Sequence, residues 1–197
     1  MPFFFDDMTT SDDKYVSRAG MKLEPALSEL GIAPVGWTCA DLGSNVGGFV
    51  DCLLQHGAAR VYAIDTGYGT LAWKLRKDSR VVVMERTNAM RVALPEQVDL
   101  VTIDVAWTKQ RHILPAAARL VRPAGLVLSL VKPHYEAPKD WLQRGILPAE
   151  RLDDVVQQVR QMVQDMNWTI RGQCPCALPG QGGNREVWLL LSRSEPA

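Results

Sequence analysis

The sequence predicts an α/β fold, with a mostly parallel sheet covered by helices on both faces. Short apolar runs alternate with segments of helical period, and successive runs end in a polar group. The chain has 197 residues, 47% hydrophobic and 22% charged, which is typical of a globular protein with a full-sized core. We expect residues 1–14 to form a mobile tail and residues 15–197 to form a single domain.

The first helix is expected to begin near Lys22, because Pro25 is tolerated only in the first turn of a helix. Gly31 is expected to end this helix. Strands are expected over Thr38–Leu42, Arg60–Ile64, Val81–Met84, Val98–Ile103, Leu126–Val131, Trp168–Gly172 and Val187–Leu191. Further helices are expected over Phe49–His56, Leu71–Lys77, Ile113–Val121 and Arg151–Met166.

Polar groups follow five of the expected strands in succession. Because ligands of open α/β sheets bind at the carboxyl ends of the strands, these groups are expected around one crevice. The groups are Asp41 with Gly43, then Asp65, Glu85, Asp104 and Lys132.

The first of these turns, Asp41–Phe49, is rich in glycine, which lets a backbone approach a ligand closely. Its spacing is not GxGxxG, which argues against an ordinary dinucleotide fingerprint. The loop resembles the acidic-x-Gly loop of class I methyltransferases, which embraces the amino-acid part of S-adenosylmethionine. The alternative is a tight turn without a ligand.

Asp65 lies 22 residues after Gly43, where a carboxylate can accept hydrogen bonds from both hydroxyls of an adenosine ribose. The alternative is a plain cap before Gly67. Residues 85–88, Glu85 to Asn88, are expected to face adenine, unless they simply start the next helix.

Asp104 and Lys132 end adjacent expected strands and should lie close together. Pro133 favours extended backbone at the lysine, which keeps Lys132 on the strand edge. A lysine near an apolar floor and other cations can orient or deprotonate a hydroxyl. The alternative is a structural salt bridge.

The formal net charge is zero, so contacts with phosphates must come from local patches. Candidates are Arg18, Lys22, Lys74, Arg76, Lys77, Lys109 and Arg111. The four cysteines have no zinc-type spacing, so free thiols and no metal are expected. Without a signal-peptide pattern or a membrane-length apolar run, we expect a cytoplasmic protein.

Several motifs resemble the TlyA-type branch of the FtsJ-like RNA ribose 2′-O-methyltransferases, from about Tyr15 to Leu191. They are residues 15–24, 43–49, 51–54, 57–65, 67–69, 71–76, 80–88, 131–133 and 183–186. The resemblance implies a Rossmann-like sheet of seven strands with an antiparallel last strand. It also implies S-adenosylmethionine as cofactor, and structured RNA, such as ribosomal RNA or an assembled ribosomal particle, as partner.

The resemblance further implies a catalytic set of Lys22, Asp104, Lys132 and Glu186. In this set Lys132 orients the 2′-hydroxyl and favours its deprotonation, while the other three hold it and balance its charge. The residues expected at the cofactor are Gly43, Ser44, Asn45, Gly47, Gly48, Phe49, Asp65, Asn88 and Asp104.

The chain departs from the family pattern on the acceptor side. It reads Val-Ala-Trp-Thr-Lys-Gln after Asp104 and His-Tyr-Glu after Pro133, and the segment Pro138–Pro148 is unlike the family. We also expect no S4-like domain ahead of the catalytic domain. The alternatives are a methyltransferase of a small molecule or protein, a non-catalytic RNA- or ribosome-binding module, and a membrane-active protein, for which no suitably amphipathic and basic segment is found.

Overall fold

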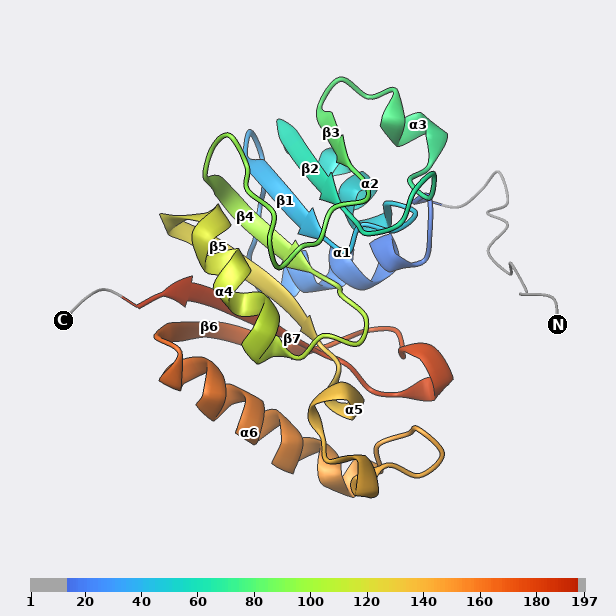
Figure 1. Cartoon of the computed structure of the whole chain (residues 1–197), viewed down its shortest axis with the longest axis vertical. Coiled ribbons are helices and arrows are strands. Elements are labelled where there is room, and N and C mark those ends of the chain that lie inside the picture. The colour runs from blue at the N-terminus through green and yellow to red at the C-terminus, as the bar shows by residue number, and fades with distance from the viewer. Residues whose placement is uncertain (1–13, 195–197) are drawn as a thin grey trace, which may run out of the picture.

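The computed structural model describes residues 14–194, which form one seven-stranded sheet between two layers of helices (Figure 1). The strand order is β3-β2-β1-β4-β5-β7-β6. Strands β1 to β5 pair in parallel, and β7 runs antiparallel between β5 and β6. The predicted fold class is therefore confirmed. Residues 1–13 of the expected tail lie outside the described residues.

The strands are β1 Thr38–Leu42, β2 Arg60–Ile64, β3 Val81–Met84, β4 Val98–Ile103, β5 Val121–Val131, β6 Trp168–Pro175 and β7 Val187–Arg193. The helices are α1 Ala19–Glu29, α2 Gly48–Gln55, α3 Trp73–Arg76, α4 Gln110–Leu120, α5 Pro133–Glu136 and α6 Leu152–Asp165. Strands β1 to β4 have the predicted bounds. Strand β5 begins earlier than predicted, and its pairing with β4 shifts register between Val98 and Leu100.

The prediction for the start of α1 was wrong, because the helix begins at Ala19 and keeps Pro25 in its interior. The amides of Gly20 and Met21 bond to carbonyls one turn earlier, so the first turn is already formed there. A side chain at Gly20 would collide with the Tyr15 ring, 2.3 Å from its Cγ. The close contact between Tyr15 and Gly20 therefore fixes the first turn of α1, ahead of Pro25.

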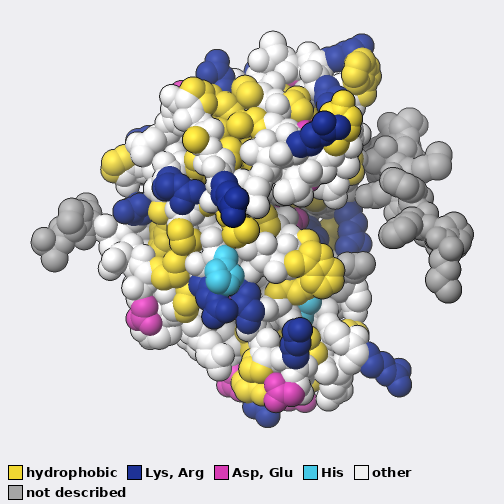
Figure 2. Space-filling view, in the orientation of Figure 1, with side chains coloured by type: hydrophobic (Ala, Val, Ile, Leu, Met, Phe, Trp, Pro, Cys, Tyr) yellow, Lys and Arg dark blue, Asp and Glu magenta, His cyan; other side chains and the backbone are white. Residues whose placement is uncertain are grey.

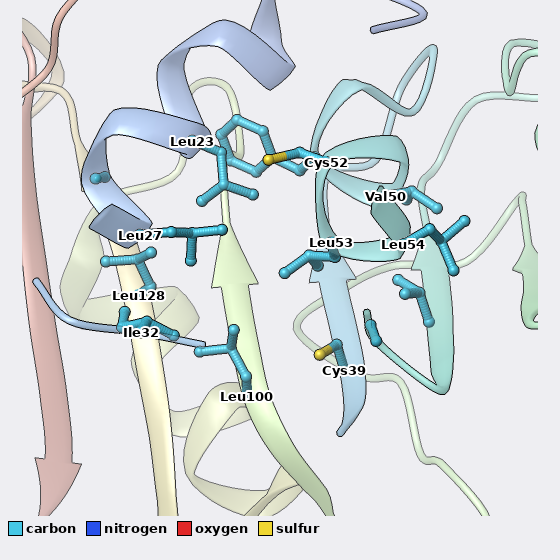
Figure 3. Close-up of a cluster of buried hydrophobic side chains, with 14 of the residues drawn as sticks. Leu23, Leu27, Ile32, Cys39, Val50, Cys52, Leu53, Leu54, Leu100 and Leu128 are labelled. Atoms are coloured by element: carbon cyan, nitrogen blue, oxygen red, sulfur yellow. The ribbon is translucent and has the colours of Figure 1, made fainter. Parts of the chain in front are cut away.

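The sheet is buried on both faces, which explains its continuous apolar strands. On one face, Leu23 and Leu27 of α1 and Leu53 of α2 pack over residues of β1, β4 and β5 (Figure 3). On the other face, α4 and α6 pack on residues such as Leu42 and Ile103. No helix within residues 14–194 is both long enough and apolar enough to cross a membrane.

Strands β1 and β4 are neighbours although two strands separate them in sequence, so the chain reverses direction across the sheet at this point. The connection after β1 runs through α2 on one face, and the connection after β4 runs through α4 on the other. A crevice at the carboxyl ends of the strands is expected at such a switch point.

Candidate active site

A cavity of about 570 Å³ opens at the carboxyl ends of β1, β2, β4 and β5, a volume typical of small-molecule sites. It brings together most of the residues predicted for the site. Of these, Lys22, Gly43, Ser44, Asn45, Phe49, Asp65, Asn88, Asp104 and Lys132 line it. Asp41 lines it as well.

Glu85 was expected near adenine, but it is not among the residues that line the cavity, and its contact with adenine stays a prediction. Its carboxylate instead accepts hydrogen bonds from the backbone N–H groups of Gly69, Thr70 and Leu71. It also pairs with Arg76, and this ion pair together with the backbone hydrogen bonds lowers the pKa of Glu85 to about 2. Glu85 therefore fixes the loop after β2, while Thr87 and Asn88 line the cavity.

The glycines of the first turn are required by packing between elements. A Cβ at Gly43 would lie 2.5 Å from the carbonyl oxygen of Asp104, so this glycine lets β1 and β4 end side by side. A Cβ at Gly47 would meet Leu75, and one at Gly48 would lie 2.8 Å from the amide of Gly20. Gly47 and Gly48 stand behind the cavity wall, and their contact with a cofactor stays a prediction.

Asp65 is held rigidly by backbone donors. The amide of Asn45 donates to its Oδ2 at 2.9 Å, and the amide of Gly67 donates to its Oδ1 at 2.7 Å. Each carboxylate oxygen can accept a second hydrogen bond, because it has two lone pairs. Asp65 therefore has a fixed orientation in the cavity wall, and each of its carboxylate oxygens can still accept a hydrogen bond from a ligand.

Asp41 lies at the bottom of the cavity and is 1% exposed. Burial raises the pKa of its carboxyl to about 7, helped by the charges of Asp104 and Asp65 and opposed by a hydrogen bond from the Thr102 hydroxyl. That hydroxyl donates to Oδ1 at 2.7 Å. The cavity floor can therefore change its charge near neutral pH.

Lys132 and Asp104 form an ion pair inside the cavity, with Nζ 2.6 Å from Oδ1. The ammonium also donates to the carbonyl of Val105 at 3.4 Å. Both side chains keep some solvent access, at 15% and 20%. The predicted neighbourhood of Asp104 and Lys132 is confirmed, and the pair can reach a molecule in the cavity.

Lys22 and Glu186 form a second ion pair, with Nζ 2.6 Å from Oε2. It is more deeply buried than the first, with side-chain exposures of 7% and 2%. Lys22 lines the cavity, and Glu186 stands behind it in the loop before β7. The predicted set of four thus consists of two separate ion pairs.

Aromatic rings lie at and beside the wall of the cavity that follows β4. Trp107 lines the cavity, is 83% exposed and has a positive φ of 61°. The Trp107 ring stacks on the Tyr135 ring, with centroids 5.2 Å apart. The centroid of the His134 ring lies 4.2 Å from that of the Tyr135 ring. Burial and the charge of Lys132 lower the pKa of His134.

Sequence reasoning noted Trp107 only as a departure from the family. The residue lies in a loop without periodic signal, so nothing in the pattern predicted its exposure. The structure shows how the loop is anchored, since the Glu136 carboxylate accepts a hydrogen bond from the amide of Gln110 at 2.7 Å. Within residues 14–194, no three His, Cys, Asp or Glu side chains group as a metal site would require.

The model of the FtsJ-like methyltransferase family matches residues 15–193. The chain belongs to this family. The predicted resemblance is thereby confirmed.

Two curated relatives are each 40% identical to the chain. One is the "16S/23S rRNA (cytidine-2'-O)-methyltransferase TlyA" of Mycobacterium tuberculosis, aligned over 190 residues, which are 93% of this chain and 70% of that protein. The other is the "Putative rRNA methyltransferase YqxC" of Bacillus subtilis, aligned over 185 residues. That alignment covers 90% of this chain and 66% of the relative, so the chain spans about two thirds of the relative's length.

Solved structures agree with the fold. A "putative hemolysin" of Streptococcus thermophilus superposes with a TM-score of 0.89 at 33% identity, covering 95% of this chain and 70% of that one. One of Lactococcus lactis superposes with a TM-score of 0.86 at 36% identity, covering 90% and 88%.

Proposed function

We propose that the chain transfers a methyl group from S-adenosylmethionine to a ribose 2′-hydroxyl of ribosomal RNA. The observation that carries the proposal is the Lys132–Asp104 ion pair, which opens into the same cavity as the backbone-held carboxylate of Asp65. Asp65, which can bind the cofactor, and Lys132, which can orient a hydroxyl group, therefore line the same cavity. We also propose a cytoplasmic location, because ribosomes work there.

The residues at the cavity suit S-adenosylmethionine. The spare acceptor capacity of Asp65 fits the two hydroxyls of an adenosine ribose. The carboxyl of Asp41 and the carboxylate of Asp104 suit the positive sulfonium and amine of the cofactor. Thr87 and Asn88 line the wall beyond Asp65, where adenine would lie.

The bound cofactor supplies a methyl group that is already activated, so the protein needs mainly to align the attacking hydroxyl. In this proposal the Lys132 ammonium orients the 2′-hydroxyl and stabilises negative charge on its oxygen, so that the hydroxyl proton is lost to water as the oxygen takes the methyl group. Asp104 fixes Lys132 by direct contact, and Glu186 holds the second lysine, Lys22, in place at the wall of the same cavity. The roles of all four residues are part of the proposal.

RNA as acceptor is supported by the relatives and by the acceptor side itself. The M. tuberculosis relative is named as an rRNA 2′-O-methyltransferase at 40% identity. The exposed ring of Trp107 offers a face on which a nucleobase can stack. Lys and Arg side chains gather on the face that carries α4 (Figure 2). Lys109, the N-cap residue of α4, and Arg111 in its first turn follow Trp107 in the chain.

The test is methyl transfer from labelled S-adenosylmethionine to ribosomal subunits and to purified ribosomal RNA, followed by digestion to nucleosides. We expect the label in a 2′-O-methylnucleoside, and folded RNA or particles should react faster than a short unstructured oligonucleotide, because the chain has no net charge to bind phosphates nonspecifically. A matched RNA with a 2′-deoxy target nucleotide is the control. Label on a base, or on the deoxy control, would contradict the ribose assignment and favour another acceptor class.

A further inference from the structure

A short hairpin follows α5 in the segment Pro138–Pro148, which the family pattern did not predict. Gln143 and Ile146 exchange two backbone hydrogen bonds of 2.9 and 3.0 Å. Between them, Arg144 and Gly145 both have positive φ, 52° and 83°, as in a type I′ turn. The tip of the hairpin is therefore closed by its own backbone.

The buried side chain of Asn184 fastens this hairpin to the loop before β7. Its Oδ1 accepts a hydrogen bond from the amide of Leu147 at 3.0 Å, and its Nδ2 donates to the carbonyl of Gly145 at 3.1 Å. Asn184 is 4% exposed. In Figure 1 the orange hairpin accordingly lies beside the red loop that joins β6 to β7.

The same loop fixes Glu186, two residues further along the chain. The amide of Gly180 donates to the carbonyl of Asn184 at 2.8 Å, which closes the loop on itself. A Cβ at Gly180 would lie 2.2 Å from Oε1 of Glu186, so Gly180 is packed directly against the carboxylate. The carboxylate is thereby confined on one side by the loop and on the other by Lys22.

We propose that Asn184 is a positioning residue: by docking the hairpin on the loop before β7, it holds Glu186 against Lys22. The inference rests on the proposed function and deepens it. A buried ion pair is favourable only when its geometry is good, so a loop that shifts would weaken the pair. Lys22 lines the cavity, and its position there therefore depends on a side chain outside the cavity.

The experiment is a double-mutant cycle on methyl transfer, with Asn184→Ala and Glu186→Gln singly and together. Asn184→Ala should lower kcat by about tenfold, as expected for loss of two hydrogen bonds to a buried amide, and leave cofactor affinity unchanged. In the Glu186→Gln background it should have almost no further effect. Equal losses in both backgrounds, or weaker cofactor binding, would overturn the inference.

Two further variants keep the test decisive. Asn184→Asp keeps the acceptor for Leu147 but loses the donor to Gly145, so it should show a smaller loss with the same dependence on Glu186. The matched control is Asp99→Ala, which breaks a similar long-range tie to the amide of Thr38 at the opposite end of the sheet. Its effect on kcat should be the same whether Glu186 is present or replaced.

A second readout does not depend on the substrate. The midpoints of urea unfolding for Lys22→Met, Glu186→Gln and the double variant report the coupling of the ion pair. The coupling energy between Lys22 and Glu186 should be smaller in the Asn184→Ala background than in the protein that keeps Asn184. An unchanged coupling energy would refute the positioning role. If no RNA is methylated but the coupling falls, the proposed function fails and the positioning role stands.

Discussion

The two halves of the cavity are built differently. In the half at β1, β2 and β3, Asp65 is fixed by the backbone amides of Asn45 and Gly67, although Asp41 accepts its hydrogen bond from the Thr102 hydroxyl. In the half at β4, β5 and β7, the groups are fixed by side chains, as Lys132 is by Asp104. The geometry of Asp65 in the first half thus depends on the backbone, and that of the second half depends on ion pairs between side chains.

This difference predicts how substitutions act. Changes in the first half should weaken cofactor binding, because a preformed set of hydrogen-bond acceptors is lost. Changes in the second half should reduce turnover or alter acceptor choice while the cofactor still binds, except at Asp104, whose carboxylate is also proposed to face the cofactor. A variant that mixes the two effects would show that the halves are not separable.

The largest effect is expected for Lys132→Ala. Removing the group that orients the hydroxyl should lower kcat by about 10²–10⁴-fold, the usual contribution of a general acid or base. Affinity for S-adenosylmethionine, measured by calorimetry, should stay within about twofold of wild type, because Lys132 lies in the second half. Wild-type turnover in this variant would make the lysine structural, and Lys132→Arg serves as the charge-conserving control.

A smaller effect is expected for Asp65→Asn in the first half. The loss of charge-assisted hydrogen bonds to ribose should cost about 1.5–3 kcal/mol, or roughly tenfold to a hundredfold in cofactor affinity. At saturating cofactor, kcat should recover, in contrast to Lys132→Ala. An unchanged dissociation constant in calorimetry would remove Asp65 from the cofactor site.

The same division explains what could be predicted from the sequence. The bounds of β1 to β4 and the place of Asp41, Asp65, Asp104 and Lys132 follow from apolar runs that end in polar residues. A parallel sheet leaves few other positions for such residues. The family motifs then predicted Lys22 and Glu186, which no local pattern could have paired.

The remaining features depend on tertiary contacts that leave no periodic signal. Glu85 turned toward the loop after β2, because a carboxylate after a strand can equally serve three backbone amides. Helix α1 begins at Ala19, where Tyr15 packs on Gly20, and so it holds Pro25 in its interior. The hairpin at Arg144 and Gly145 lacks the Asn-Gly or Asp-Gly pair that usually indicates a type I′ turn.

Trp107→Ala tests the second half without touching an ion pair. Stacking of a base on an aromatic side chain contributes about 1–3 kcal/mol, so KM for RNA should rise by roughly fivefold to a hundredfold, with about tenfold as the central expectation. Cofactor affinity should not change. Trp107→Phe, which keeps a stacking face, should recover most of the loss, and an equal loss in both variants would argue against stacking.

The smallest effect on activity is expected for Asp41→Asn, which instead changes how stability depends on pH. The pKa of Asp41 is raised from 3.8 to about 7 in the folded chain, chiefly by burial. Between these two values the folded state holds a proton that the unfolded state has released, so the free energy of unfolding of the wild type falls as pH rises. Below 3.8 both states are protonated, and above about 7 both are ionised, so the dependence is confined to this window.

The asparagine variant cannot titrate at this position and should lack that decline. The difference in thermal midpoint between the variant and the wild type should therefore rise steadily from pH 4 to pH 7 and then stay constant. The corresponding change in the difference between their free energies of unfolding is on the order of 2–4 kcal/mol. Any fixed cost of burying the amide shifts the whole curve and leaves this slope intact. Parallel curves for the two proteins across the window would show that Asp41 is ionised in the fold at all these pH values. The cavity floor would then carry a fixed negative charge, and the first half would bind the cationic cofactor with an affinity that does not depend on pH.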